Sequence, residues 1–376
     1  MTRHRLRLVN QPPSELAETL AQVNARYGAG SVCRASEIKQ PGRISTGSFI
    51  LDFCLLGGLP HNRISMIAGE RSSGKTLLAS KVIASAQQQF PEQAVIFLDI
   101  EGSWASTWAQ QLGVDIDRLQ IIPCETGEMA VDVADAVVRS KEASLLVIDS
   151  LAALVPMKEI ESSADDNAQV ALQARLIGSM IRKVTAGLIT ERKRQHYITV
   201  LFLNQFRNRI GMAFGDPRIL PGGKALEFST SVQLIIKNKE KPGKDARDID
   251  TIEVNEHSFT ITKNKLNAGP RTGEFRLVRA PDPELGLSVG AIDDAKTLLI
   301  YAKKFGAYQG GGSRWTLAFD PIAIDFRSVQ EAIVYLYQQP AVYTALRNWV
   351  IREQARQLGM PAAFLATFGG EVSSHA

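Results

Sequence analysis

The chain is poor in the residues that hold secreted and metal-binding proteins together. Its 376 residues include only three cysteines, Cys33, Cys54 and Cys124, and none of them lie in a C-x-x-C pair. An odd number without that spacing predicts neither a disulfide framework nor a metal site, and is typical of a protein kept in a reducing cytosol.

Long apolar runs are also absent. No stretch approaches the ~18 residues that a membrane span requires, and the basic start, Met-Thr-Arg-His-Arg-Leu-Arg-Leu, lacks the apolar segment of a secretory signal. We therefore expect a cytoplasmic protein with no membrane contact. The net charge of +4 permits an anionic partner without requiring one, so the position of the charge matters more than its sum.

What the chain does contain is a phosphate-binding pattern. Residues 69–76 read G-x-x-x-x-G-K-[ST], after a short apolar run at 64–68 and before helix-forming residues at 76–89. Glycines let successive N–H groups point into one concavity, to which the following helix adds its positive end. Such a strand–loop–helix context favours a nucleotide site over a chance Gly/Ser turn. The predicted nucleotide-binding residues of this loop are Gly69, Glu70, Arg71, Ser72, Ser73, Gly74, Lys75 and Thr76.

Strands and helices alternate after this loop. Parallel βαβ units are therefore expected, which gives an α/β fold with a mainly parallel twisted sheet. The strands are expected near residues 94–99, 119–122 and 144–149, and the helices near 103–112 and 128–140. Ligands bind at the carboxyl ends of the strands in such sheets, and Asp99, Glu101 and Asp149 occur there.

These side chains predict ATPase chemistry. Lys75 would reach the β- and γ-phosphates, and Thr76 would put its hydroxyl on Mg²⁺, which Asp149 would hold through water. Glu101 follows a strand and could activate the attacking water, although a solvated loop acid is an equal alternative. Trp108 could stack on adenine, but an isolated Trp slightly favours the core.

Two later segments are candidate DNA loops. Residues 156–167 are charged and aperiodic, which predicts an exposed loop; the helix after them carries Arg175 and Arg182. A buried strand at 197–203 leads to Gln205 and to a glycine-rich loop at 206–223. In this second loop basic and apolar residues alternate, which suits contact with a nucleic-acid backbone and insertion between bases, with a solvated basic loop as the alternative.

Both ends of the chain carry further elements. An amphipathic helix begins at Ser14, and its stripe of Leu16, Leu20, Val23 and Tyr27 favours packing on the chain's own core. Strands are expected at 231–236 and 251–265. Helical segments at 328–338 and 341–357 predict a small separate C-terminal domain.

Taken together, the motifs resemble the RecA recombinase family from about residue 14 to about residue 357. Many matches in one order make this resemblance specific. They are Ile44-Ser45-Thr46-Gly47-Ser48, the phosphate loop, Leu112-Gly113-Val114-Asp115, Asp149-Ser150-Leu151-Ala152-Ala153-Leu154, Asn204-Gln205-Phe206-Arg207, Phe214-Gly215-Asp216-Pro217, Gly222-Gly223-Lys224-Ala225-Leu226 and Lys263-Asn264-Lys265.

The resemblance implies a role for each matching position. Glu101 would activate water, Gln205 would sense the γ-phosphate, and Trp108 would stack on adenine. Lys263 and Lys265 would reach ATP on a neighbouring subunit, the helix at 14–27 would dock on that subunit, and Phe228 would lie at the interface. The residues expected to contact DNA, in loops 156–175 and 206–223 and near them, are Arg175, Arg182, Arg207, Arg209, Ile210, Gly222 and Gly223.

It also implies how the chain is organised and what it binds. We expect a segment at 1–35 that docks on the next protomer, a RecA-like ATPase core at 36–284 and a small C-terminal α+β domain at 285–376. ATP and Mg²⁺ are the expected cofactors. The expected partners are single-stranded DNA, double-stranded DNA, further copies of the chain in a helical filament, and a LexA-like repressor.

Some positions depart from the family pattern. Glu70-Arg71 replaces the usual Pro-Glu, Glu227 and Gln233 stand where basic residues are common, and the last residues contain no acidic tail. Autoregulation by such a tail is therefore not expected.

The leading hypothesis is an ATP-dependent recombinase that forms a filament on single-stranded DNA and acts in recombination, repair and the SOS response to DNA damage. A ring-forming replicative helicase would share the phosphate loop and Asp149, but not the ordered matches at 222–223 and 263–265. A non-catalytic regulator is disfavoured because Lys75, Thr76, Glu101 and Asp149 are all present. The absence of L-S-G-G-Q disfavours a transporter ATPase.

Overall fold

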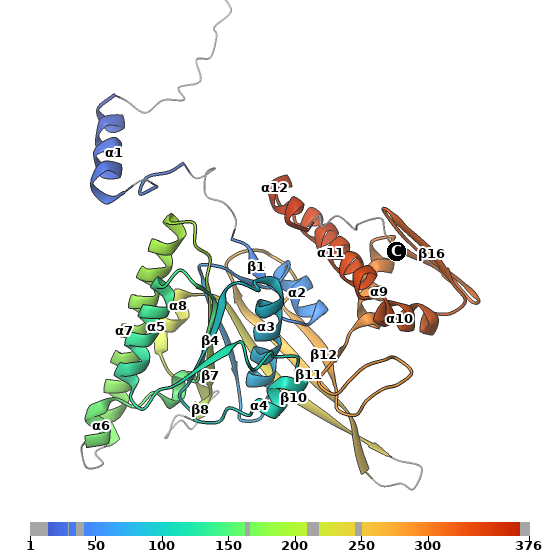
Figure 1. Ribbon diagram of the computed structural model, residues 1–376, viewed down its shortest axis with the longest axis horizontal. Coiled ribbons are helices and arrows are strands. Elements are labelled where there is room, and N and C mark those ends of the chain that lie inside the picture. The colour runs from blue at the N-terminus through green and yellow to red at the C-terminus, as the bar shows by residue number, and fades with distance from the viewer. Residues whose placement is uncertain are drawn as a thin grey trace, which may run out of the picture.

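A large sheet with helices on both faces forms the centre of the molecule, and a smaller C-terminal unit lies beside it (Figure 1). The computed structural model describes residues 14–28, 30–34, 41–161, 166–208, 218–244 and 250–368.

The central sheet has nine strands in the order β13-β12-β11-β10-β3-β7-β6-β4-β5. Neighbours from β10 to β5 pair in parallel, whereas β11, β12 and β13 extend the sheet antiparallel. The strands are β3 (Ile64–Gly69), β4 (Ala94–Asp99), β5 (Leu119–Pro123), β6 (Ala143–Asp149), β7 (Thr199–Gln205), β10 (Thr230–Lys244), β11 (Asp250–Asn264), β12 (Thr272–Val278) and β13 (Ile292–Asp293).

Helices bury both faces of this sheet. Along β6, Leu145 and Val147 face one core cluster, and Leu146 and Ile148 face the other, as the two-residue period of a strand requires. In Figure 1, α5 and α7 lie on one side of the sheet and α3 on the other. The helices are α2 (Phe49–Leu55), α3 (Lys75–Gln89), α4 (Ser106–Gln111), α5 (Gly127–Arg139), α6 (Met157–Glu161), α7 (Asp166–Lys193) and α8 (Gly223–Ser229).

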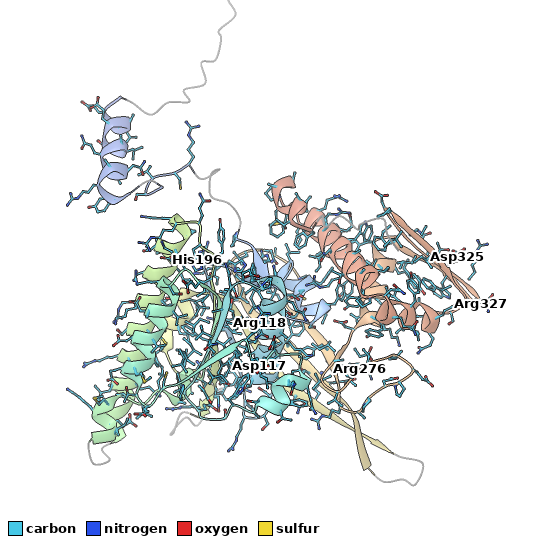
Figure 2. All side chains as sticks on the ribbon, viewed as in Figure 1. Asp117, Arg118, His196, Arg276, Asp325 and Arg327 are labelled. Atoms are coloured by element: carbon cyan, nitrogen blue, oxygen red, sulfur yellow. The ribbon has the colours of Figure 1, made fainter. Side chains whose placement is uncertain are left out.

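Short elements complete the core, and a compact α+β unit follows it. The core adds β1 (Arg43–Ile44), β2 (Leu59–Pro60), a 3-10 turn (Leu151–Ala153), β8 (Arg207–Asn208) and β9 (Arg218–Ile219). The C-terminal unit contains α9 (Ala295–Lys304), β14 (Tyr308–Gly311), β15 (Arg314–Phe319), β16 (Ile322–Phe326), α10 (Val329–Gln338), α11 (Pro340–Gln357), α12 (Ala362–Leu365) and a last 3-10 turn (Ala366–Phe368). Asp325 and Arg327 lie in this unit, away from the central sheet (Figure 2).

The predicted α/β fold with a mainly parallel sheet and a small C-terminal unit is confirmed. One local expectation was wrong: residues 156–167 were expected to be a loop, but α6 and the first two residues of α7 fall within them, and residues 162–165 lie outside the described part. The sequence shows no apolar period over these residues, which concealed the helices.

The amphipathic helix near the N-terminus is α1 (Ser14–Tyr27). The expectation that its apolar stripe packs on the chain's own core was also wrong, because Leu16 is 47% and Tyr27 61% exposed. In Figure 1, α1 stands apart from the sheet.

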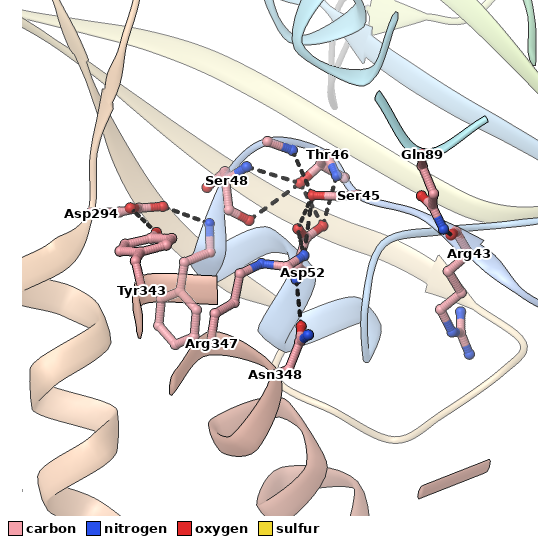
Figure 3. A network of polar contacts seen from close by, with 12 residues as sticks. Arg43, Ser45, Thr46, Ser48, Asp52, Gln89, Asp294, Tyr343, Arg347 and Asn348 are labelled. Carbon is pink, nitrogen blue, oxygen red and sulfur yellow. Dashed lines mark hydrogen bonds and ion pairs between the residues drawn. The ribbon is translucent and has the colours of Figure 1, made fainter. Parts of the chain in front are cut away.

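A buried polar network fastens the C-terminal unit to the core (Figure 3). Asp52 of α2 accepts hydrogen bonds from Ser45 Oγ at 2.6 Å and Thr46 N at 2.8 Å, and it pairs with Arg347 of α11. Beside it, Asp294 accepts from Phe49 N at 2.6 Å. Burial raises the pKa of Asp294 to about 6. Each of these two buried carboxylates thus has a partner that is distant in the sequence, Arg347 for Asp52 and Phe49 for Asp294.

Within the described residues, no helix is long and apolar enough to cross a membrane.

Replacing Arg347 with Ala should lower the free energy of unfolding by roughly 3–5 kcal/mol, because the fully buried Asp52 would lose its cation. Urea denaturation measures the effect. Arg314→Ala is the matched control: its pair with Asp325 at 3.6 Å is largely exposed, and its loss should cost less than about 1 kcal/mol. Equal losses in the two variants would show that the buried pair contributes no more than a surface pair.

Candidate nucleotide and DNA site

The phosphate loop is a tight turn between the buried strand β3 and helix α3. Gly74 has φ 97°, a left-handed conformation, and is the N-cap residue of α3. A Cβ on Gly69 would lie 2.3 Å from Ser73 Oγ and 2.6 Å from Ile236 O. The predicted glycines are therefore required by the backbone, which wraps closely enough to form an anion-binding concavity at the helix N-terminus.

Lys75 lies within this loop. Its ammonium group donates to Glu70 O at 2.7 Å and to Gly69 O at 3.4 Å, and the residue is 5% exposed. Burial lowers its pKa, while the carboxylates of Asp149 and Glu101 oppose that shift. A cation held on neutral carbonyls in a buried place is well suited to exchange them for phosphate oxygens.

The predicted Mg²⁺ residues meet across the sheet edge. Thr76 Oγ1 donates to Asp149 Oδ2 at 2.8 Å. Burial raises the pKa of Asp149 to about 6, and the hydrogen bond from Thr76 opposes this. A hydroxyl and a carboxylate at one point are the hard oxygen ligands that Mg²⁺ takes.

Glu101 is held from two sides. The Ser150 hydroxyl and Gln205 Nε2 both donate to Glu101 Oε1, the latter at 2.5 Å. Asp99 supports the loop that carries Glu101, since its carboxylate accepts from the N–H groups of Ser103 and Trp104, each at 3.2 Å. The carboxylate thus has two side-chain partners, although Glu101 itself is exposed.

Gln205 also begins the candidate DNA loop. Its strand β7 continues into β8, which pairs with β9 at the far side of the loop. Arg207 donates to Gln173 Oε1 at 3.1 Å and to Ala152 O, so it holds β8 against α7. Arg218 pairs with Glu70 of the phosphate loop at 3.3 Å. The strand before the loop, β8, thus contacts α7 and the turn after Asp149, and the strand after it, β9, contacts the phosphate loop.

The other predicted DNA residues are dispersed around this loop. Arg175 and Arg182 are exposed on α7. Gly222 has φ 101° and begins α8, of which Gly223 is the first residue. Arg209 and Ile210 lie outside the described residues.

Trp108 is 38% exposed on α4 and belongs to no core cluster of the described residues. The core alternative for it is thus not supported. The structure instead packs Trp104 on Phe97, with ring centroids 4.7 Å apart.

Lys263, in β11, and Lys265, just after this strand, contact the C-terminal end of α8. Lys263 Nζ donates to Glu227 O, and Lys265 Nζ donates to Phe228 O at 2.8 Å. Burial and the charge of Lys265 lower the pKa of Lys263. The two ammonium groups are held by the negative end of a helix beside Phe228, which is 67% exposed.

Sequence reasoning missed some contacts of the site. Ser150 follows Asp149 in the sequence but had no predicted role. Glu70 and Arg218, which pair with each other, are 148 positions apart in the chain. No local pattern marks His257 of β11, which contacts the phosphate loop at Ser73 O.

Comparison with known proteins agrees with this geometry. A family model described as the RecA N-terminal domain matches residues 14–281. The protein RecA of Clavibacter michiganensis is 42% identical over 268 residues, or 70% of each chain. RecA of Leifsonia xyli is 40% identical over 299 residues, covering 78% of this chain and 79% of the relative, and RecA of Bacillus licheniformis is 39% identical over 296 residues, covering 77% and 80%.

The chain belongs to the RecA family. It is a nucleotide-binding, DNA-dependent ATPase and a recombinase that acts in recombination and repair. None of these comparisons favours the helicase alternative.

Glu101→Gln should reduce ATP turnover by roughly 10²–10⁴, the usual contribution of one positioned base. ATP and DNA should stay bound, because Gln keeps the shape and an acceptor oxygen for Gln205. Steady-state hydrolysis and separate binding titrations measure the two effects. Asp325→Asn, in the C-terminal unit, is the matched acid-to-amide control. If Glu101→Gln hydrolyses ATP at the parental rate, Glu101 does not activate water and is an ordinary loop acid.

Proposed function

We propose that the site binds ATP with Mg²⁺. The phosphate loop and the α3 N-terminus would hold the phosphates, Lys75 would exchange its carbonyl contacts for phosphate oxygens, and Thr76 with Asp149 would hold the cation. When bound, Mg²⁺ neutralises charge on the phosphates. Glu101 would take the proton of the attacking water, and Trp108, exposed on α4, would cover adenine.

We further propose that the protein polymerises as a helical filament on single-stranded DNA and exchanges strands with a homologous duplex. The observation that carries this proposal is the hydrogen bond of 2.5 Å from Gln205 to Glu101. It joins the acid at the nucleotide site to the first arm of the DNA loop. A γ-phosphate that draws Gln205 toward itself would break this bond and shift β8, so nucleotide state and DNA affinity would be coupled.

Contacts between protomers complete the site in this proposal. The exposed stripe of α1 would dock on the next protomer. Lys263 and Lys265 would leave the α8 carbonyls for the phosphates of the neighbour's ATP, where two cations gain more than at a helix end. Arg175, Arg182, Arg207, Arg209 and Ile210 would lie along the DNA, with Gly222 and Gly223 at the base of the second loop.

Three further assignments are proposals of the same kind. A LexA-like repressor would bind the filament, and the units would divide at 1–35, 36–284 and 285–376. A reducing cytoplasm fits the three free cysteines.

Electron microscopy with ATP and single-stranded DNA tests the proposal. Helical filaments are expected, and they should require nucleotide because ATP bridges protomers. Closed rings without filaments would contradict the assembly, even though the family assignment would stand.

ATP should be hydrolysed only between subunits. A Lys263→Ala/Lys265→Ala protein and a Lys75→Ala protein, each inactive alone, should regain partial DNA-stimulated hydrolysis when they are mixed. At mixed junctions the intact phosphate loop of the first would meet the intact lysines of the second. Hydrolysis across a range of mixing ratios is the measurement.

Lys303→Ala/Lys304→Ala, which removes two exposed lysines from α9, is the matched control and should keep parental activity. If the Lys263/Lys265 variant alone hydrolyses ATP fully, the lysines do not act on the neighbour's nucleotide. Failure of the mixture to recover, with both proteins shown on the same DNA, would contradict the proposal as well.

A further inference from the structure

His257 of β11 is buried against the phosphate loop. It is 1% exposed, and its strand neighbour in the β11–β12 register is Phe275. The two rings stack with centroids 5.1 Å apart and an interplanar angle of 23°. The imidazole therefore has Phe275 beside it and cannot turn freely away from the loop.

One ring nitrogen contacts the loop backbone directly. His257 Nδ1 lies 3.2 Å from Ser73 O. A carbonyl oxygen can only accept, so Nδ1 must carry the proton of this hydrogen bond. The ring also limits the adjoining residue, since a Cβ on Gly74 would lie 2.6 Å from its Cε1 and 2.8 Å from its Nδ1.

The contact fixes one peptide unit of the loop. In a planar trans peptide the C=O of one residue and the N–H of the next point in opposite directions. Holding Ser73 O toward β11 therefore turns the N–H of Gly74 away from β11, toward the open side of the loop. Convergent N–H groups of this kind form the anion site of a phosphate-binding loop.

We propose that His257 is a positioning residue for nucleotide binding: through Ser73 O it sets the direction of the Gly74 N–H, a donor for a phosphate oxygen shared by ATP and ADP. The proposal extends the ATPase function shown by the family assignment to a residue outside the loop motif. The competing explanation is a packed core histidine that only fills space.

Three variants distinguish these roles. His257→Asn places an amide N–H close to the position of Nδ1 and so keeps the donor. His257→Gln carries the amide one bond further out, beyond that position, and His257→Leu fills part of the space without any donor. Thr260→Ala, at an exposed position of the same strand, is the control.

We expect the Leu and Gln variants to raise the KM for ATP and the Kd for ADP by a common factor of roughly 2–10, the range of one net hydrogen bond. The value of kcat with DNA should change by less than about twofold, because the lost interaction is the same in ground and transition states. His257→Asn should stay within about twofold of the parent in both constants.

Thermal unfolding without nucleotide separates packing from positioning, since all three His257 variants lose the stacked ring. If KM follows the loss of thermal stability and Asn behaves like Gln, His257 only packs, and the proposal is overturned. Parental KM and Kd in every variant overturn it too. If His257→Leu does not fold, the Asn and Gln pair, which are alike in polarity, still decides between the two roles.

Discussion

The register of the parallel strands is the constraint on which the site depends. Asp99 lies opposite Asp149, and Gly69 lies opposite Gln205, at the carboxyl ends of four strands. A strand shifted by one residue would turn the side chains of Asp99, Asp149 or Gln205 to the other face. The two core clusters prevent such a shift, because alternate residues of each strand pack into the clusters on opposite faces of the sheet. Apolar packing in the interior thus positions polar groups at the edge.

The polar groups at this edge hydrogen-bond to one another and to the loop backbone. Lys75 rests on loop carbonyls, Thr76 on Asp149 and Gln205 on Glu101. Polar groups buried without partners would be costly, and in the proposed function each of these bonds would be exchanged for one to a phosphate or to its cation. In the proposed function, these same contacts would couple nucleotide binding to the DNA loop.

The sequence predicted the parts of the molecule that local patterns encode. The phosphate loop, the strand ending at Asp149 and the helix at 14–27 follow from glycine spacing, an apolar run and a stripe. Family resemblance, rather than chemistry, gave Gln205 and the two lysines their roles. The contact of His257 with Ser73 could not be predicted, because it depends on how β11 pairs with β10 and β12. Helix α6 was missed because its side chains show no apolar period.

The salt bridge of Asp52 with Arg347 has a consequence for dissecting the chain. It places one charge in the core and its partner in α11, so the C-terminal unit is not a removable module. A truncation before α11 would leave a carboxylate stranded in an apolar interior. A loss of activity in such a shortened protein would reflect a destabilised core rather than the function of the missing unit. Fragments for functional mapping therefore need a neutral residue in place of Asp52.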